Sequence, residues 1–349
     1  MLIHIRKKVL TDAAQLQEPN DWLAMAMQNI AQAKVQGAHL IFIERGAVEL
    51  IATNLISNWT LRVLTSIESE AAQYGNLREK LAVYVEIEKL DGLIEKEVRN
   101  GKTIIKIPLR NFADSRITQR ARLVGENIND CRLYERLSAI HIGKYHSKDY
   151  PANIKFELIG GGGNTTAESL KELSTENHTL ALCITDSDKA MPSSTEGETS
   201  KLCSAVRLSY LCHYYNINAR SIENLLHYQQ IEHILGIEKE RKVLLKNLEF
   251  LKCFANTVHW FHLPLKNGIK LKSATQTAEL LYWNPFVAGD FDGTYKIPPI
   301  SKKLLAWAVE LTNENNMPPS PDGNPVYETW DKLSALISSW GCCSDAMRA

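Results

Sequence analysis

Short apolar runs alternate with amphipathic segments through the middle of the chain. The runs RARLVGEN (120–127), NIKFELI (153–159) and TLALCIT (179–185) have the length and apolar content of buried strands. Between them, INDCRLYERLSAI (128–140) and TTAESLKEL (165–173) repeat apolar residues at helical spacing. This alternation predicts a parallel α/β sheet, whose functional site lies beyond the carboxyl ends of the strands.

The pattern on either side of this section is more helical. In the N-terminal region we predict a helix over 21–36, a long helical stretch over about 60–98, and short strands over 39–46 and 102–109. Helical patterns return in SKLCSAVRLSYLCHYY (200–215) and continue to the end, where we expect residues 341–349 to fray. The predicted organisation is a mixed, mainly helical region over 1–118, an α/β domain over 119–235 and a helical region over 236–349.

The composition excludes several classes of protein. Among 349 residues, 40 Lys and Arg balance 40 Asp and Glu, so any surface that binds nucleic acid must be local. No run reaches the roughly 18 apolar residues of a membrane helix, and the start of the chain does not have the pattern of a secretory signal. The seven cysteines form no CxxC pair, which is typical of reduced thiols. We therefore expect a cytoplasmic protein that does not contact a membrane.

Acidic residues follow two of the predicted strands. Glu126 follows the strand at 120–125, and Asp186 and Asp188 follow the strand at 179–185. Because the carboxyl ends of parallel strands meet at one edge of the sheet, we expect the three side chains to converge. Close carboxylates repel unless one is protonated or a cation lies between them. The acids therefore predict a Mg²⁺ or Mn²⁺ site suited to phosphodiester chemistry, and the alternative is a plain surface turn.

Three segments together resemble the Toprim domain, the Rossmann-like catalytic module of type IA and II topoisomerases, bacterial primases and OLD-family nucleases. These segments are LVGENINDCRLYERL, ELIGGGGNTT and LALCITDSDK, and the resemblance covers 119–230. It implies that Glu126 is the strand-end glutamate, Asp130 the acid four positions later, and Asp186 and Asp188 the aspartate pair. Asn127 stands where the family usually has glycine. The fold implied is a Toprim parallel-sheet core with largely helical N- and C-terminal additions.

A further segment, NARSIENLLHYQQ (218–230), resembles the one after the aspartate pair in small Toprim proteins of bacterial phage-defence systems, including those associated with ATPases or retrons. This resemblance makes Glu223 an additional metal ligand or a support for the ligands. The alternative is that Glu223 and Asn224 face solvent on a helix.

The function that the resemblance implies is a Mg²⁺- or Mn²⁺-dependent nuclease that cuts DNA or RNA in antiphage defence. Glu126, Asp186 and Asp188 would be catalytic, with Glu126 also a general base, and Lys189 would hold the scissile phosphate. The helical flanks would bind substrate, a partner ATPase or retron-type protein, or a second copy of the chain. The rival interpretations are a primase- or topoisomerase-type enzyme and a non-catalytic Toprim scaffold.

Two other motifs are less specific. The run Gly160–Gly163 either allows a tight passage from strand to helix or contacts phosphate, but no P-loop lysine follows it. A second Asp-x-Asp, in AGDFDG (288–293), lacks the rest of a calcium-binding loop and predicts a turn.

Four arginines precede Glu126 and are candidates for contact with nucleic acid: Arg110, Arg116, Arg120 and Arg122.

Overall fold

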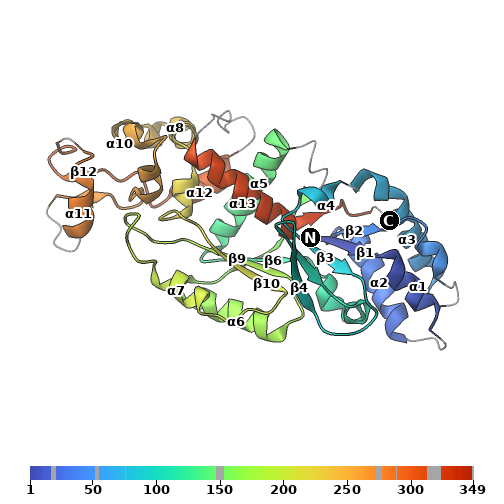
Figure 1. Cartoon of the computed structure of the whole chain (residues 1–349). Helices are drawn as coiled ribbons and strands as arrows, with labels where there is room; N and C mark the ends of the chain where they lie inside the picture. The colour runs from blue at the N-terminus through green and yellow to red at the C-terminus, as the bar shows by residue number, and fades with distance from the viewer. Residues whose placement is uncertain are drawn as a thin grey trace.

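A computed structural model describes residues 1–16, 21–51, 55–74, 76–146, 153–271, 277–287, 289–312 and 324–347. It shows an α/β protein with two mostly parallel sheets and a helical region beside the second sheet (Figure 1). Within these ranges, no helix is both long enough and apolar enough to cross a membrane.

The N-terminal region contains a five-stranded sheet in the order β2-β1-β3-β5-β4. Four strands are parallel, and β4 at the edge is antiparallel to β5. The strands are β1 (Leu2–Ile5), β2 (Leu40–Ile43), β3 (Val83–Ile87), β4 (Glu95–Arg99) and β5 (Lys102–Lys106). The helices are α1 (Lys7–Ala14), α2 (Asp21–Val35), α3 (Asn58–Tyr74) and α4 (Leu77–Lys80).

This region is therefore a second α/β unit, where the sequence predicted a mixed, mainly helical region. The two strands predicted over 39–46 and 102–109 are confirmed as β2 and β5. The predicted helical stretch over 60–98 is wrong beyond α4, because β3 and β4 occupy its second half. All five residues of β3 are buried. A strand covered on both faces does not alternate apolar and polar residues, so a short buried run of this kind cannot be separated from a buried helix by periodicity.

The second sheet has four parallel strands in the order β10-β9-β6-β8. They are β6 (Arg122–Gly125), β8 (Glu157–Gly160), β9 (Ala181–Thr185) and β10 (Cys212–Asn216). The prediction of a parallel α/β sheet over this section is confirmed. The helical pattern predicted over 200–215 is wrong after Ser204, where α7 (Glu198–Ser204) ends, and β10 begins at Cys212.

Helices cover both faces of the second sheet (Figure 1). Leu123 and Leu182 join the large core that includes α5 (Ile128–Tyr145) and α13 (Pro325–Gly341). Val124 and Cys183, which point to the opposite face, join a smaller core with α6 (Thr166–Glu176) and α7. The alternation of side chains along β6 and β9 thus builds two cores on one sheet.

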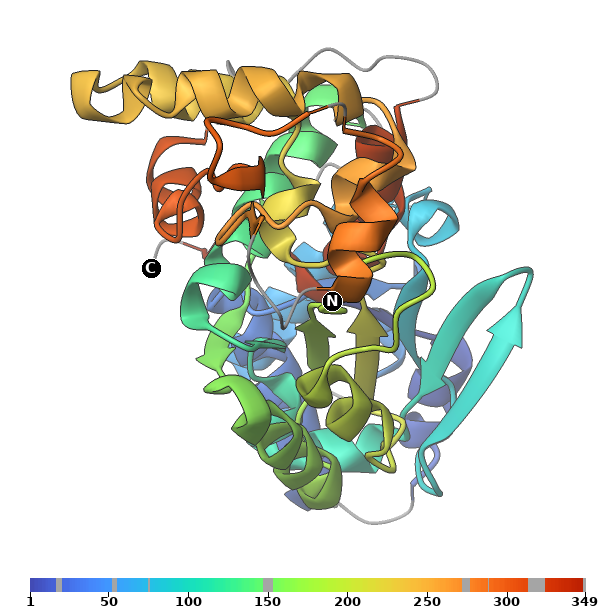
Figure 2. The same ribbon diagram turned by 90° about the vertical axis from the view of Figure 1, so that its left-hand side faces the viewer.

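The C-terminal region is mainly helical. Its helices are α8 (Tyr228–Gly236), α9 (Lys239–Lys242), α10 (Leu245–Leu251), α11 (Thr277–Trp283), α12 (Leu304–Leu311) and α13, with short strands β11 (Ile269–Lys270) and β12 (Tyr295–Ile297). Figure 2 shows that β9 and β10 point toward this region, so part of it lies over the carboxyl edge of the sheet.

The end of the described chain is packed, not frayed. After α13, β13 (Cys342–Cys343) pairs with β7 (Asn153–Ile154), and both cysteines are buried. The buried amino group of Met1 donates a hydrogen bond to the carbonyl oxygen of Cys342. The expectation of fraying is therefore wrong over 341–347, because this segment bonds to β7 on one side and to the backbone of Val35 and His39 on the other. Residues 348–349 lie outside the described part.

Candidate metal centre

Glu126 leaves the end of β6 at the carboxyl edge of the second sheet. Its Oε1 accepts a hydrogen bond from the backbone N–H of Asp186 (3.2 Å), which holds the glutamate against the end of β9. Its carbonyl oxygen accepts from the N–H groups of Gly162 (2.9 Å) and Gly163 (3.2 Å). The ends of β6 and β9 are thus in contact, through the side chain of Glu126 and the backbone of Asp186.

The glycine run packs against this contact. Gly162 and Gly163 have φ of +73° and +71°, a region in which side chains are strained. A Cβ on Gly161 would lie 2.3 Å from Thr166 Oγ1, and one on Gly160 would lie 2.9 Å from Ile128 N. These contacts account for the glycines as a tight passage from β8 to α6 around the backbone of Glu126.

Asp130 lies in the first turn of α5 and is buried. Its Oδ2 accepts a hydrogen bond from the N–H of Asn127 (2.8 Å), while Asn127 Oδ1 accepts from the N–H of Asn129 (2.9 Å). The two bonds are a capping box. Asn127 has an extended backbone (φ −135°), so this position does not need the glycine that is usual in the Toprim pattern.

Asp186 and Asp188 lie in the loop after β9, which ends at Thr185. Asp186 is buried and Asp188 is exposed. The N–H of Asp188 donates to Arg220 O (3.1 Å), and Asp188 has φ +55°. Gly197 packs directly on it, since a Cβ there would lie 2.2 Å from Asp188 Oδ2. A loop, not an extension of the strand, therefore sets the directions of both carboxylates.

Glu223 is fully buried in a short 3-10 helix, η5 (Ile222–Leu225). The Asn224 side chain anchors this turn by donating to Trp260 O (2.8 Å) and Leu263 O (2.9 Å). The alternative that Glu223 and Asn224 face solvent is therefore wrong. Glu223 Oε1 lies 3.2 Å from Lys266 Nζ, and Glu223 Oε2 has no hydrogen-bond partner among the described residues.

The acids raise one another's pKa. Burial, followed by the charges of Asp188 and Asp130, raises the pKa of Glu126 to about 7. Burial and the charge of Glu223 raise the pKa of Asp130 to about 6, although its backbone hydrogen bond opposes this. Burial and the neighbouring acids raise the pKa of Asp186 well above its usual value. The site therefore contains more negative charge than its surroundings compensate.

Lys266 is the cation that opposes these shifts. Its charge lowers the pKa of Glu126, Asp130 and Asp186. Burial lowers the pKa of Lys266, but Glu223 and Asp186 outweigh burial and the net shift is upward. We did not identify Lys266 from the sequence, because its segment PLKNGIK carries no motif.

Lys189, the lysine predicted to hold the phosphate, lies beside Glu196. Its Nζ lies 3.9 Å from Glu196 Oε1, and its carbonyl oxygen accepts a hydrogen bond from His262 Nδ1 (3.0 Å). Three of the predicted arginines also pair with local acids, as Arg110 does with Asp91, Arg116 with Asp114 and Arg122 with Glu157. Arg120 donates to the carbonyl oxygen of Gly37.

Oxygen ligands and uncompensated charge fit a hard divalent cation such as Mg²⁺ or Mn²⁺. The unpartnered Glu223 Oε2 is the observation that supports this fit, because a buried carboxylate oxygen without a partner is costly. The acids are nevertheless spread apart: in the described part of the chain, no three of their side chains bring ligand atoms within 4.8 Å of one another.

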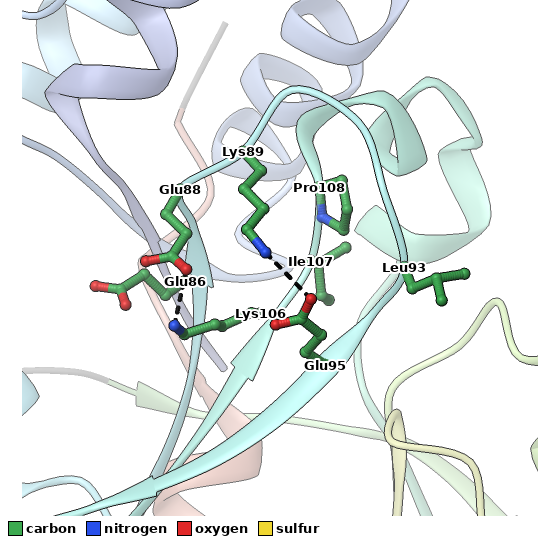
Figure 3. Close-up of a pocket in the computed structure, with 8 residues that line it drawn as sticks. All are labelled: Glu86, Glu88, Lys89, Leu93, Glu95, Lys106, Ile107 and Pro108. Carbon is green, nitrogen blue, oxygen red and sulfur yellow. Dashed lines mark hydrogen bonds and ion pairs between the residues drawn. The ribbon is translucent and has the colours of Figure 1, made fainter.

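The carboxyl edge of the N-terminal sheet is also polar, but its charges are paired. Figure 3 shows a small pocket there, in which Lys106 pairs with Glu88 and Lys89 pairs with Glu95. The nitrogen–oxygen distances of these ion pairs are 2.7 and 3.1 Å. The pocket has room for about one water molecule. This edge is therefore a weaker candidate than the acids on the second sheet.

No family model, curated protein or solved structure matches the chain. The assignment of a function therefore depends on the geometry of the site and on the resemblance carried by its motifs.

Proposed function

We propose that the chain is a divalent-metal-dependent nuclease of the Toprim type that cleaves phosphodiester bonds in DNA or RNA. The observation that carries this proposal is the gathering of acids from β6, α5, β9 and η5 at one sheet edge, where Glu223 Oε2 lacks a partner. If these acids only stabilised the fold, each buried carboxylate would be expected to pair with a cation. Here Lys266 is the cation that acts on the buried acids.

A negative site of this kind repels the phosphate group of a substrate unless a cation is present. Glu126, Asp186 and Asp188 would hold the ion, with Glu223 and Asp130 as further ligands or supports. A bound Mg²⁺ or Mn²⁺ would polarise the phosphate and lower the pKa of an attacking water.

The side chains themselves contribute two further functions. Glu126, at the end of β6, would also accept a proton from the attacking water as a general base. Lys266, whose side chain is 41% exposed, can present its ammonium group to a phosphate oxygen. Lys189, which follows Asp188 in the chain, remains the other candidate for this contact.

The biological setting that we propose is antiphage defence in a bacterium, by resemblance to small Toprim effectors. The substrate is DNA or RNA, and the helical C-terminal region over the site is the candidate surface for substrate, a partner ATPase or retron-type protein, or a second copy. The non-catalytic scaffold makes the opposite prediction, which is no cleavage under any metal condition.

The test is cleavage by purified protein of single-stranded DNA, duplex DNA and tRNA with Mg²⁺, Mn²⁺ or EDTA. Glu126→Gln, Asp186→Asn and Asp188→Asn are expected to abolish cleavage. The matched control is Asp292→Asn, in the second Asp-x-Asp, which should cleave normally. Asp292 accepts a hydrogen bond from the N–H of Thr294 in a turn, and its φ of +49° is close to the +55° of Asp188. Full activity in both Glu126→Gln and Asp186→Asn would remove the site assignment.

A further inference from the structure

Two histidines and an aspartate meet at the end of α5 that is remote from Asp130. His146 Nε2 lies 2.7 Å from Asp331 Oδ1, and His141 Nε2 lies 3.4 Å from the same oxygen. Asp331 belongs to α13, which packs along α5. Within the described ranges, this is the set of three possible metal ligands whose atoms all lie within 4.8 Å of one another.

The ligand types and spacing match a transition metal, not Mg²⁺. Imidazole nitrogen suits zinc and its neighbours, whereas Mg²⁺ favours oxygen ligands. A tetrahedral ion with bonds of about 2.0 Å separates its ligand atoms by about 3.3 Å. The two nitrogen–oxygen distances, 2.7 and 3.4 Å, lie on either side of this value. We propose that His141, His146 and Asp331 form a binding site for Zn²⁺ or a similar ion that joins α5 to α13.

One ligand of this site is buried and the other two are partly exposed to solvent. The buried His141 ring is held between Tyr145 and Tyr327, with ring centroids 4.9 and 5.2 Å away. The side chains of His146 and Asp331 are 29% and 46% exposed. Three protein ligands with access to solvent leave a fourth position for water.

The site is separate from the acids of the candidate nuclease centre. Asp130 and His141 are eleven residues apart on α5, which corresponds to about 16 Å along a helix axis. An ion bound to His141, His146 and Asp331 would therefore tie the C-terminal helix to the helix that begins at Asp130. Its role is to fix α13 on the second sheet, and it does not depend on the proposed nuclease activity.

The alternative arrangement is a hydrogen-bonded one, in which Asp331 accepts from both imidazoles without an ion. The chain offers a matched control for this alternative. His178 Nδ1 lies 3.3 Å from Asp114 Oδ2, and both side chains are partly exposed. This pair is not part of a three-ligand set in the described residues, so it reports what a histidine–aspartate contact contributes alone.

The experiment is titration of EDTA-treated full-length protein with Zn²⁺ by calorimetry, and with Co²⁺ by visible absorption, both in excess Mg²⁺. We expect one ion per chain and a rise in Tm on adding Zn²⁺. His146→Gln and Asp331→Asn should each weaken Zn²⁺ binding by about tenfold or more. His178→Gln should bind Zn²⁺ with wild-type affinity. Glu126→Gln and Cys253→Ser should also keep wild-type Zn²⁺ affinity, and they test whether the acids or the exposed thiol bind the ion.

Wild-type affinity for Zn²⁺ no higher than that of a His146→Gln/Asp331→Asn double variant would overturn the proposal and leave the hydrogen-bonded arrangement. Circular dichroism of each variant establishes that its fold is intact. Both substituted residues are partly exposed, so replacing them disturbs the fold less than replacing the buried His141 would. Because the readout is metal binding, failure of the nuclease assay leaves this result unaffected.

Discussion

Glu126→Gln is expected to stabilise the metal-free protein at pH 8. The native pKa of Glu126 is about 7, compared with 4.5 for an unperturbed glutamate. A carboxyl group whose pKa is raised by folding stabilises the fold when protonated, and this contribution is lost as pH rises from about 4.5 through 7. Glutamine is neutral at every pH, and its side-chain oxygen can still accept the hydrogen bond from Asp186 N–H.

The magnitude follows from the shift. A change from 4.5 to about 7 corresponds to about 3 kcal/mol at pH 8, where the folded carboxyl is ionised. Relaxation of the loop around Glu126 reduces this, so we expect a gain of about 1 to 3 kcal/mol, or a few degrees in Tm. At pH 5 the folded glutamate is mostly protonated, and the gain should fall to about 1 kcal/mol or less.

The assay is urea unfolding in EDTA at pH 5 and pH 8, with Glu172→Gln as control because Glu172 is exposed on α6. Mg²⁺ should then stabilise the wild type and Glu172→Gln, but have little effect on Glu126→Gln. The reasoning is refuted if Glu126→Gln unfolds more easily than the wild type at pH 8, or if its effect is equal at the two pH values.

Two further substitutions test neighbouring contacts. Lys266→Met should destabilise the protein by about 1 kcal/mol at pH 8, a value discounted for the partial exposure of Lys266. The loss should be smaller at pH 5, where Glu126 and Asp130, whose charges Lys266 opposes, are mostly protonated. Urea unfolding with no pH dependence would contradict this. Gly197→Ala should reduce metal-dependent cleavage by roughly 100-fold, because its Cβ would lie 2.7 Å from Asp188 Cβ and displace that residue. Gly236→Ala, with nothing within 4 Å of the new Cβ, should cleave normally, and equal rates for the two alanine variants would refute the displacement.

The strands that end at Glu126 and Asp186 were accessible to sequence reasoning. Each is a short apolar run that stops at an acid, and the helices between them repeat apolar residues with helical spacing. Parallel connection then places the ends of β6 and β9 at one edge. The structure brings the side chain of Glu126 to the backbone of Asp186, as this reasoning requires.

Other elements carried no separable local signal. β1 and β3 were missed because a short buried run fits either a strand or part of a helix. β10 was missed because its sequence, CHYYN, continues an apparently helical pattern and its residues are mostly half-buried. The tail at 341–347 looked terminal and free, but it pairs with β7 and accepts a hydrogen bond from Met1. Such contacts join residues that lie far apart in the chain.

The amino-acid sequence by itself determined the parallel α/β core and the acids at the ends of its strands, because local periodicity and connection rules act over a few tens of residues. Only the tertiary structure decided that Lys266 faces those acids while Lys189 pairs with Glu196, and that Asp331 meets His141 and His146. The charge around a site is the sum over side chains brought together by packing, and no local pattern records which remote residue completes it.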